Sequence, residues 1–157
     1  MSASLCWLGG VVICKGIIAP KTDQIWFSNI SLNLLYLIIT NLTDCRYRFT
    51  YILDQYLRIK CPRLMKQLRM YGFIDMCNTV SRNVPLSLME HNSEIRNAFV
   101  GGLTSTFVRR GNILEFYFID EIIVNQIIHV LELENMEYIK IYHTYGGVKL
   151  RLSAFHI

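Results

Sequence analysis

The chain has 157 residues, a formal net charge of +4 and 52% apolar side chains. This apolar fraction excludes an intrinsically disordered chain, and the length allows one ordinary domain or two very small ones. The basic residues are concentrated in the first half, where residues 46–69 contain seven lysines and arginines against one acid, Asp54.

The first stretch, residues 1–45, is apolar and carries few charges. Its most apolar part, residues 30–42, is too short to cross a bilayer, because a transmembrane helix needs roughly 20 residues. We therefore predict a buried helix here, with a membrane-associated element as the alternative.

The second stretch, residues 46–84, is basic and aromatic. A short amphipathic helix is predicted over 62–71, because Pro62 suits the first helical position and Gly72 the residue just past the end. The outer side of this helix is either a solvated basic face or a phosphate contact, and its basic residues are Arg63, Lys66 and Arg69.

The third stretch, residues 85–157, is typical of a compact α+β unit. A helix is predicted over 86–100 with Gly101-Gly102 ending it, then a strand over 113–118 and a helix over 120–134. The predicted fold class is therefore α+β: a C-terminal α-β-α-β-β domain (85–157), whose small mixed sheet packs on two helices, preceded by a largely helical basic extension (1–84). No internal repeat is visible.

The chain is predicted to close with a β-hairpin of strands 138–144 and 148–155, with Gly146-Gly147 as the turn. Alternation along the strands predicts one core face and one wet, cationic face. The residues predicted for the core face are Ile139, Ile141, Val148, Leu150 and Leu152. Those predicted for the cationic face are Lys140, Tyr142, Lys149, Arg151 and Ser153.

The element order and the motif Ile95-Arg96-Asn97-Ala98 resemble the N-terminal half of the bacterial small-subunit ribosomal protein eight family. The family's C-terminal half has no counterpart here, so the resemblance implies either a separate chain supplying that half or its replacement by other proteins. It also implies a structural component of the mitochondrial small ribosomal subunit. The implied partners are small-subunit rRNA and neighbouring ribosomal proteins.

The location predicted is the mitochondrial matrix, in the ribosome, with the protein encoded in the organelle. The chain contains 20 isoleucines and 10 asparagines, whose codons are AT-rich, but only 4 alanines. Organellar genomes often have this skew, and an AT-rich nuclear genome is the alternative source.

Positive side chains are expected to hold RNA phosphates. The predicted RNA-binding residues are Arg46, Arg48, Arg58, Lys60, Arg63, Lys66, Arg69, Arg96, Asn97, Arg109, Arg110, Lys140, Lys149 and Arg151.

No catalytic pattern is recognisable in the sequence. The four histidines are scattered, no cysteine pair has zinc-ligand spacing, and the glycine pairs lack the lysine of a phosphate loop. We therefore expect no enzyme activity, metal, cofactor or small-molecule substrate. The alternative function is an organelle-encoded accessory subunit of a respiratory-chain membrane complex, suggested by the apolar segments.

Overall fold

The computed structural model describes residues 1–19, 21–75 and 82–154. The chain forms two successive units with the same element order, helix–strand–strand–helix–strand–strand. The first unit contains α1 (Ala3–Lys15), β1 (Gly16–Ala19), β2 (Gln24–Phe27), α2 (Leu32–Asp44), β3 (Thr50–Leu53) and β4 (Leu57–Lys60), and is followed by α3 (Pro62–Met70). The second begins after α4 (Leu86–Glu90) and contains α5 (Ser93–Thr104), β5 (Val108–Arg110), β6 (Ile113–Phe118), α6 (Glu121–Leu133), β7 (Tyr138–Tyr142) and β8 (Val148–Ser153).

Each unit builds one four-stranded antiparallel sheet. The strand orders are β1-β2-β4-β3 and β5-β6-β8-β7, so the two sheets have the same topology. The structure thus contains an internal repeat where the sequence analysis expected none. The predicted boundary between 84 and 85 lies between the two units, and the division into two separate domains stays a prediction.

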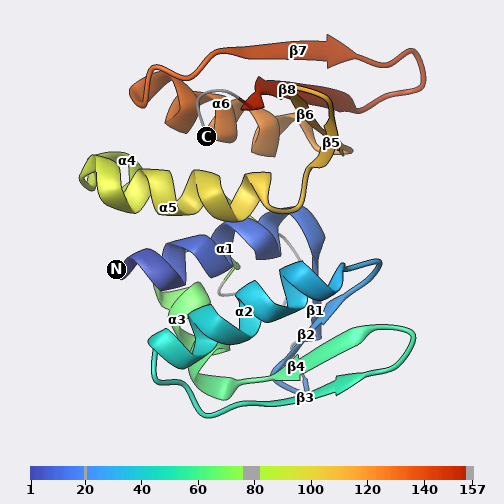
Figure 1. The fold of residues 1–157 in the computed structure, drawn as a ribbon. Helices are drawn as coiled ribbons and strands as arrows, with labels where there is room; N and C mark the ends of the chain where they lie inside the picture. Colours follow the sequence, from blue (N-terminus) through green and yellow to red (C-terminus); the bar gives the residue numbers. More distant parts are fainter. Residues whose placement is uncertain (20, 76–81, 155–157) are drawn as a thin grey trace.

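Helices α1 and α5 lie side by side in the middle of the molecule, with one sheet and its helices on either side of the pair (Figure 1). Glycines allow their backbones to meet. A Cβ atom added at Gly10 would lie 2.4 Å from the carbonyl oxygen of Phe99, and one at Gly102 would lie 2.0 Å from that of Trp7. Only glycine fits at these two positions without moving the helices.

Four helices begin at residues that cap helices well. Side chains of Ser2, Ser31, Asn92 and Asp120 each accept a hydrogen bond from a backbone N–H in the first turn of α1, α2, α5 and α6, respectively. Such caps satisfy donors that the helix itself leaves unpaired. Local sequence therefore fixes where these helices begin.

Several predicted elements are confirmed. Most of the apolar segment 30–42 lies in α2, which begins at Leu32, and the basic segment 62–71 forms α3 as far as Met70. The strand over 113–118 and the helix over 120–134 are β6 and α6. Both strands of the final hairpin are present, although Phe155 lies outside the described residues. Among the helices described, none has both the length and the apolar character needed to cross a membrane.

Other parts of the predicted fold need correction. The mixture of helices and strands is present, but residues 1–84 hold a four-stranded sheet as well as helices, and the second sheet is antiparallel throughout. The strand β5 was not predicted. The helix predicted over 86–100 is divided into α4 and α5, and α5 continues through Gly101-Gly102 to Thr104 instead of ending there.

The final hairpin has a different register from the predicted one. Lys140 pairs with Leu150 and Ile139 with Arg151, and five residues, 143–147, connect the strands. Because directly paired residues share a face, Lys140 lies on the core side and Ile139 on the open side. The prediction that Lys140 shares an open face with Arg151 is wrong, because it assumed a two-residue turn.

The corrected register predicts that Ile139→Ala changes the free energy of unfolding by no more than about 0.5 kcal/mol, as expected for a surface position. Ile139 is 60% exposed in the structure. If it were a core residue, the same truncation would cost about 2–5 kcal/mol. Urea denaturation of the wild type and the variant distinguishes the two registers.

Candidate nucleic-acid interface

Each sheet packs one face on helices and leaves the other face open. In β4, for example, Leu57 and Ile59 are buried, whereas Arg58 and Lys60 alternate with them on the other side. The strand register identifies the remaining residues that share that side. The open face of the first sheet consists of Ile17, Ala19, Gln24, Trp26, Thr50, Ile52, Arg58 and Lys60.

Arg58 is the central cation of the first open face. Its guanidinium lies 5.6 Å from the ring centroid of Trp26, and its Nη2 forms an ion pair with Asp54. Its Nε is buried and has no hydrogen-bond partner among the described residues. The indole N–H of Trp26 donates to Gln24 Oε1 at 2.9 Å, so the amide of Gln24 is held beside the cation.

The open face of the second sheet follows from its register in the same way. It consists of Val108, Arg110, Ile113, Glu115, Tyr117, Ile139, Ile141, Lys149, Arg151 and Ser153. Glu115 is central and only 6% exposed. Its carboxylate accepts from Arg151 Nε at 3.0 Å and lies 3.3 Å from Arg110 Nε and 3.9 Å from Lys149 Nζ. The hydrogen bond from Arg151, together with the positive charges around it, lowers the pKa of Glu115, so the carboxylate is ionised at neutral pH.

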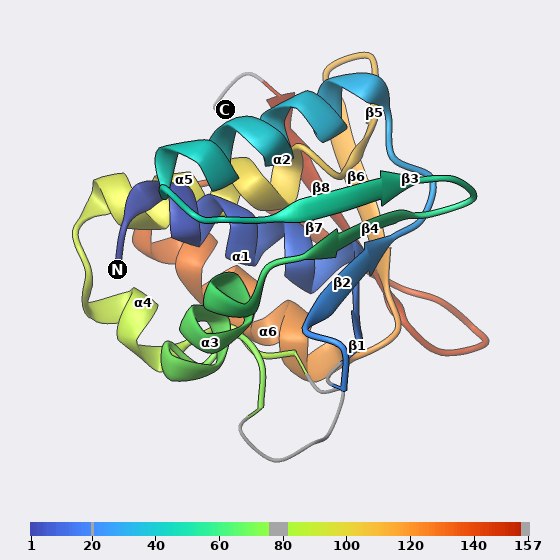
Figure 2. The ribbon, with the colours of Figure 1, turned by 90° about the horizontal axis from the view of Figure 1, so that it is seen from below.

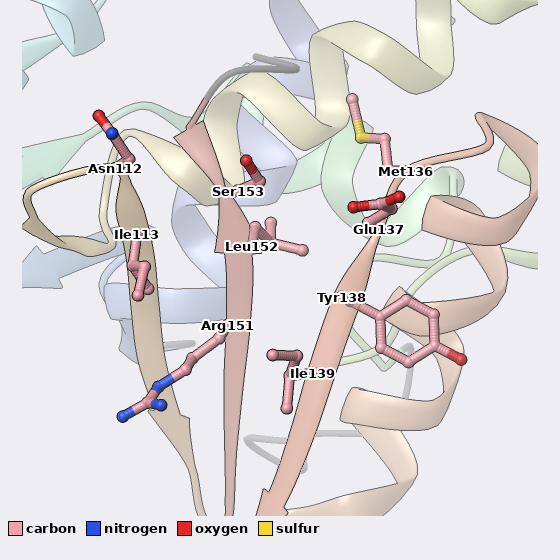
Figure 3. Close-up of a pocket in the computed structure, with 9 residues that line it drawn as sticks. All are labelled: Asn112, Ile113, Met136, Glu137, Tyr138, Ile139, Arg151, Leu152 and Ser153. Atoms are coloured by element: carbon pink, nitrogen blue, oxygen red, sulfur yellow. The ribbon is translucent and has the colours of Figure 1, made fainter.

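A groove of about 650 Å³ lies at one end of the second open face (Figure 3). Ile113, Ile139 and Arg151 line it from three neighbouring strands, and the guanidinium of Arg151 projects away from its own strand. Apolar side chains, the cation of Arg151 and one acid, Glu137, therefore border the same hollow. Such a surface can contact both the planar bases and the charged backbone of a nucleic acid.

The two open faces are arranged alike around the central helices. Helices α1 and α5 run in the same direction, and the first strand of each sheet follows the end of its helix (Figures 1 and 2). Two units of equal topology that meet through a pair of parallel helices are related by an approximate twofold rotation, whose axis runs between the two helices and parallel to them. Both open faces therefore have the same inclination to the helix pair, and one elongated ligand can contact both.

The ends of α1 and α5 do not provide a metal site. Lys15 ends α1 and donates from Nζ to the carbonyl oxygen of Asn29 at 3.0 Å. Arg82 donates to the carbonyl oxygen of Gly16 at 2.9 Å, and burial raises the pKa of the neighbouring Cys14 thiol to about 12. Among the described residues, no three His, Cys, Asp or Glu side chains gather to hold a metal ion.

Five of the predicted RNA-binding residues lie on the open faces, namely Arg58, Lys60, Arg110, Lys149 and Arg151. Two acids form ion pairs with these cations, Asp54 with Arg58 and Glu115 with the three cations of the second face, so positive charge predominates on both surfaces and favours a polyanion. Arg109 is exposed but alternates with Arg110 and points to the other side of β5. The structure shows where these residues lie, and their contacts with a nucleic acid stay predictions.

The other predicted residues are dispersed. Arg46 and Arg48 lie between α2 and β3. In α3, Arg63 lies over the ring of Tyr47 and Arg69 is 3.9 Å from Asp23, so these cations are engaged beside the open face and not on it. Lys140 donates to Glu121 and Asn125 of α6 on the core side of the second sheet. The structure therefore does not bring all of these cations onto one surface.

Arg96 and Asn97 make contacts within the fold. Arg96 pairs with Glu134 at the end of α6 and donates to the carbonyl oxygen of His91, while Asn97 donates to Ser93 Oγ at 2.9 Å. The motif that carries these two residues thus connects α5 with α6.

Sequence reasoning missed Gln24, Trp26, Glu115 and Tyr117 as open-face residues. The signal in β2 was a four-residue alternation, Gln24-Ile25-Trp26-Phe27, in which Ile25 and Phe27 are buried. A pattern this short is compatible with many structures. The role of Glu115 depends on three cations that only the folded register brings together.

The sequence matches no protein-family model and no curated protein. Solved structures do match. Full-length DUF199/WhiA from Thermatoga maritima aligns with a TM-score of 0.64 at 13% identity, over 96% of this chain and 50% of that one. The N-terminal LAGLIDADG domain of DUF199/WhiA gives 0.61 at 14% identity, over 98% and 76%. I-DmoI in complex with DNA and Mn gives 0.63 at 13% identity, over 96% and 89%.

These similarities correct the functional predictions. The resemblance to ribosomal protein eight is wrong, because the matches extend over almost the whole chain and are to a different fold. The predicted roles in the ribosome or a respiratory complex, and the predicted rRNA and ribosomal-protein partners, are therefore also wrong. The prediction of no enzyme activity is contradicted by the fold, which this chain shares with the homing endonuclease I-DmoI.

This chain spans about half the length of full-length DUF199/WhiA. Identities of 13–14% establish a common fold and nothing further. The paired central helices and the two sheets of equal topology are the fold of the LAGLIDADG domain.

Proposed function

We propose that this chain binds double-stranded DNA through the open faces of its two sheets. The observation that carries the proposal is the pair of similarly inclined open faces, whose five cations outnumber the two acids paired with them, Asp54 and Glu115. The fold is shared with I-DmoI, whose structures include its target DNA. Positive residues on both sides of an approximate twofold axis suit the similar backbones of the two DNA strands.

The proposed binding mode places strands in the major groove on either side of the helix ends. The major groove admits β-structure and exposes a different pattern of donors and acceptors for every base pair. Exposed cations such as Lys60 would hold phosphates, whereas Gln24 and Arg58 have the side-chain chemistry that recognises base edges. Each sheet would contact one half of the binding site.

Structures of I-DmoI contain Mn, Mg or Ca. In this chain the described residues at the end of α1 do not fit such an ion, because a lysine, an arginine and a neutral thiol stand there. We therefore derive no step through a metal. The predicted mitochondrial location, which rests on amino-acid composition alone, stays a prediction.

The proposal is tested by selecting binding sites from a random duplex DNA library with the full chain. Enrichment of a duplex sequence, bound more tightly than single-stranded RNA of the same sequence, is the expected result. Denaturing electrophoresis of the enriched duplex, with Mg²⁺ or Mn²⁺ added, reports strand cleavage in the same samples. Failure to enrich any duplex, or equal affinity for the RNA, would overturn the proposal.

A pair of substitutions compares the contribution to DNA binding of a charge on an open face with that of a charge elsewhere on the surface. Lys60→Ala should weaken DNA binding to a similar extent for all sequences, and should reduce the slope of log affinity against log salt by about 1. Lys66→Ala removes the same charge from the exposed side of α3, and it should leave the slope unchanged. Fluorescence anisotropy at several salt concentrations measures both slopes, and equal slopes for the two variants would contradict the proposed face.

A further inference from the structure

Glu115 connects the cations of the second open face through one carboxylate. Its Oε2 accepts from Arg151 Nε at 3.0 Å, and its Oε1 lies 3.3 Å from Arg110 Nε. Arg151 is thus held by a hydrogen bond through Nε, at the base of its guanidinium. Arg110 forms an ion pair with the same carboxylate, and its side chain is 75% exposed. The side chain of Arg151 extends over the sheet with its terminal nitrogens at the free end (Figure 3).

The first sheet holds its arginine in the opposite way. The ion pair of Arg58 with Asp54 uses the terminal Nη2, while its Nε is buried and without a hydrogen-bond partner among the described residues. A ligand that needs the terminal nitrogens of Arg58 must therefore displace Asp54. The terminal nitrogens of Arg151 are available without such a rearrangement.

We propose that Glu115 is a positioning residue that presents Arg151 to guanine in the major groove. This inference rests on the proposed function, and it names the base that the second sheet recognises. Guanine offers two acceptors on its major-groove edge, O6 and N7, and the two terminal nitrogens of an arginine donate to them together. Holding Nε to a carboxylate fixes the guanidinium plane while leaving that pair of donors free.

Direct readout of cytosine by Glu115 is the competing chemistry, because a carboxylate can accept from the cytosine amino group. The contacts argue against it. Glu115 is 6% exposed, and both of its oxygens already face arginine Nε atoms. Arg110 lies beside the same carboxylate. Any guanine that it contacts should therefore be in the same base pair as the guanine read by Arg151 or in the next one, about 3.4 Å away along a strand.

The experiment starts from the duplex enriched by the selection described above. We expect one or two adjacent guanines in the half-site that contacts the second sheet. Replacing each by 7-deazaguanine, which lacks the N7 acceptor, or by adenine should weaken binding by between about 5-fold and 150-fold, the range of a bidentate contact. Hydroxyl-radical footprints from a cleavage reagent attached at Ser153→Cys assign the half-site to the second sheet.

Glu115→Gln should reduce the preference for guanine over adenine by about 10-fold, within the range of that contact. It should also bind unrelated DNA as tightly as the wild type or more tightly, because a negative charge is lost. A purely structural role would weaken binding to all sequences together. The matched control is Glu121→Gln, since Glu121 holds Lys140 on the core side of the same sheet, and it should keep the wild-type preference.

Arg151→Lys retains the charge and removes the paired donors. It should lose the guanine preference while keeping the salt dependence of binding. An enriched site without guanine, or a preference unchanged in Glu115→Gln and Arg151→Lys, would overturn this inference and leave DNA binding intact. If no duplex is enriched at all, the proposed function itself fails.

Discussion

Gly102→Ala is expected to lower the free energy of unfolding by about 3 kcal/mol or more, at the upper end of what overpacking costs. The added Cβ would lie 2.0 Å from the backbone carbonyl oxygen of Trp7, and a backbone atom cannot rotate away as a side chain can. Relief requires α1 and α5 to separate, which would open the centre of the core. Urea denaturation followed by circular dichroism measures the change.

The neighbouring glycine supplies the control. A Cβ at Gly101 would be 3.5 Å from Trp7 Cδ1, which is ordinary van der Waals contact. Because alanine is favoured over glycine inside a helix by roughly 0.5–1 kcal/mol, Gly101→Ala should leave the protein at least as stable as the wild type. Equal stability of the two variants would show that the helices do not meet as closely as described.

The sequence predicted two elements of the second unit well, because they are long and have clear boundaries. The helix over 120–134 combines an N-cap residue, Asp120, with an apolar stripe, and it is present as α6. The strand over 113–118 is bounded by Asn112 and Ile119 and is present as β6. In such segments the local preferences and the tertiary structure agree.

The first sheet could not be predicted because each of its strands has only four residues. Four residues give two positions on each face, which is too few to distinguish a strand from a loop or a helix end. In addition, β3 is an edge strand with all four residues exposed, so its sequence shows no alternation in burial. The hydrogen bonds to β4, and not a local sequence pattern, make this segment a strand.

The hairpin shows how a small error in a loop changes a predicted surface. A two-residue turn would pair residue 145 with Val148, whereas the observed five-residue connection pairs Tyr142 with it, a shift of three residues and therefore an odd number. Because side chains alternate along a strand, that shift moves every residue of β7 to the opposite face. Lys140 was consequently assigned to the cationic face, although it contacts Glu121 and Asn125 on the other side.

The internal repeat left one readable signal in the sequence. The stretches Leu8-Gly9-Gly10-Val11 and Val100-Gly101-Gly102-Leu103 both place two glycines between large apolar residues. Paired glycines commonly end helices, and this reading was applied to the second pair. Two such pairs, each inside an apolar segment, also fit two helices that approach each other closely, as α1 and α5 do.

Arg96→Ala is expected to lower the free energy of unfolding by about 3–5 kcal/mol, because it leaves a buried carboxylate without its cation. The side chains of Arg96 and Glu134 are 16% and 7% exposed, and their ion pair joins the start of α5 to the end of α6. Arg109→Ala is the control, since Arg109 is exposed, and it should change stability by less than about 0.5 kcal/mol.

A double substitution and the pH dependence of stability distinguish the electrostatic contribution of the Arg96–Glu134 ion pair from the contribution of side-chain packing. Arg96→Met with Glu134→Leu should recover most of the stability that Arg96→Ala loses, because apolar residues of similar volume replace buried ion pairs well. Burial alone would raise the pKa of Glu134, but hydrogen bonds from Ser93 and Arg96 and the charge of Arg96 outweigh it, so the pKa lies below the ordinary 4.5.

A depressed folded-state pKa means that the ionised carboxylate stabilises the fold above pH 4.5, and that this contribution is lost as the pH falls from 4.5 through the folded-state pKa. The wild type should therefore lose stability in this acid range. Arg96→Ala should lose less over the same range, because the cation that lowers the pKa is gone. Urea denaturation at a series of pH values between neutral and acid measures both curves, and parallel curves for the two proteins would show that Arg96 does not stabilise the ionised form of Glu134.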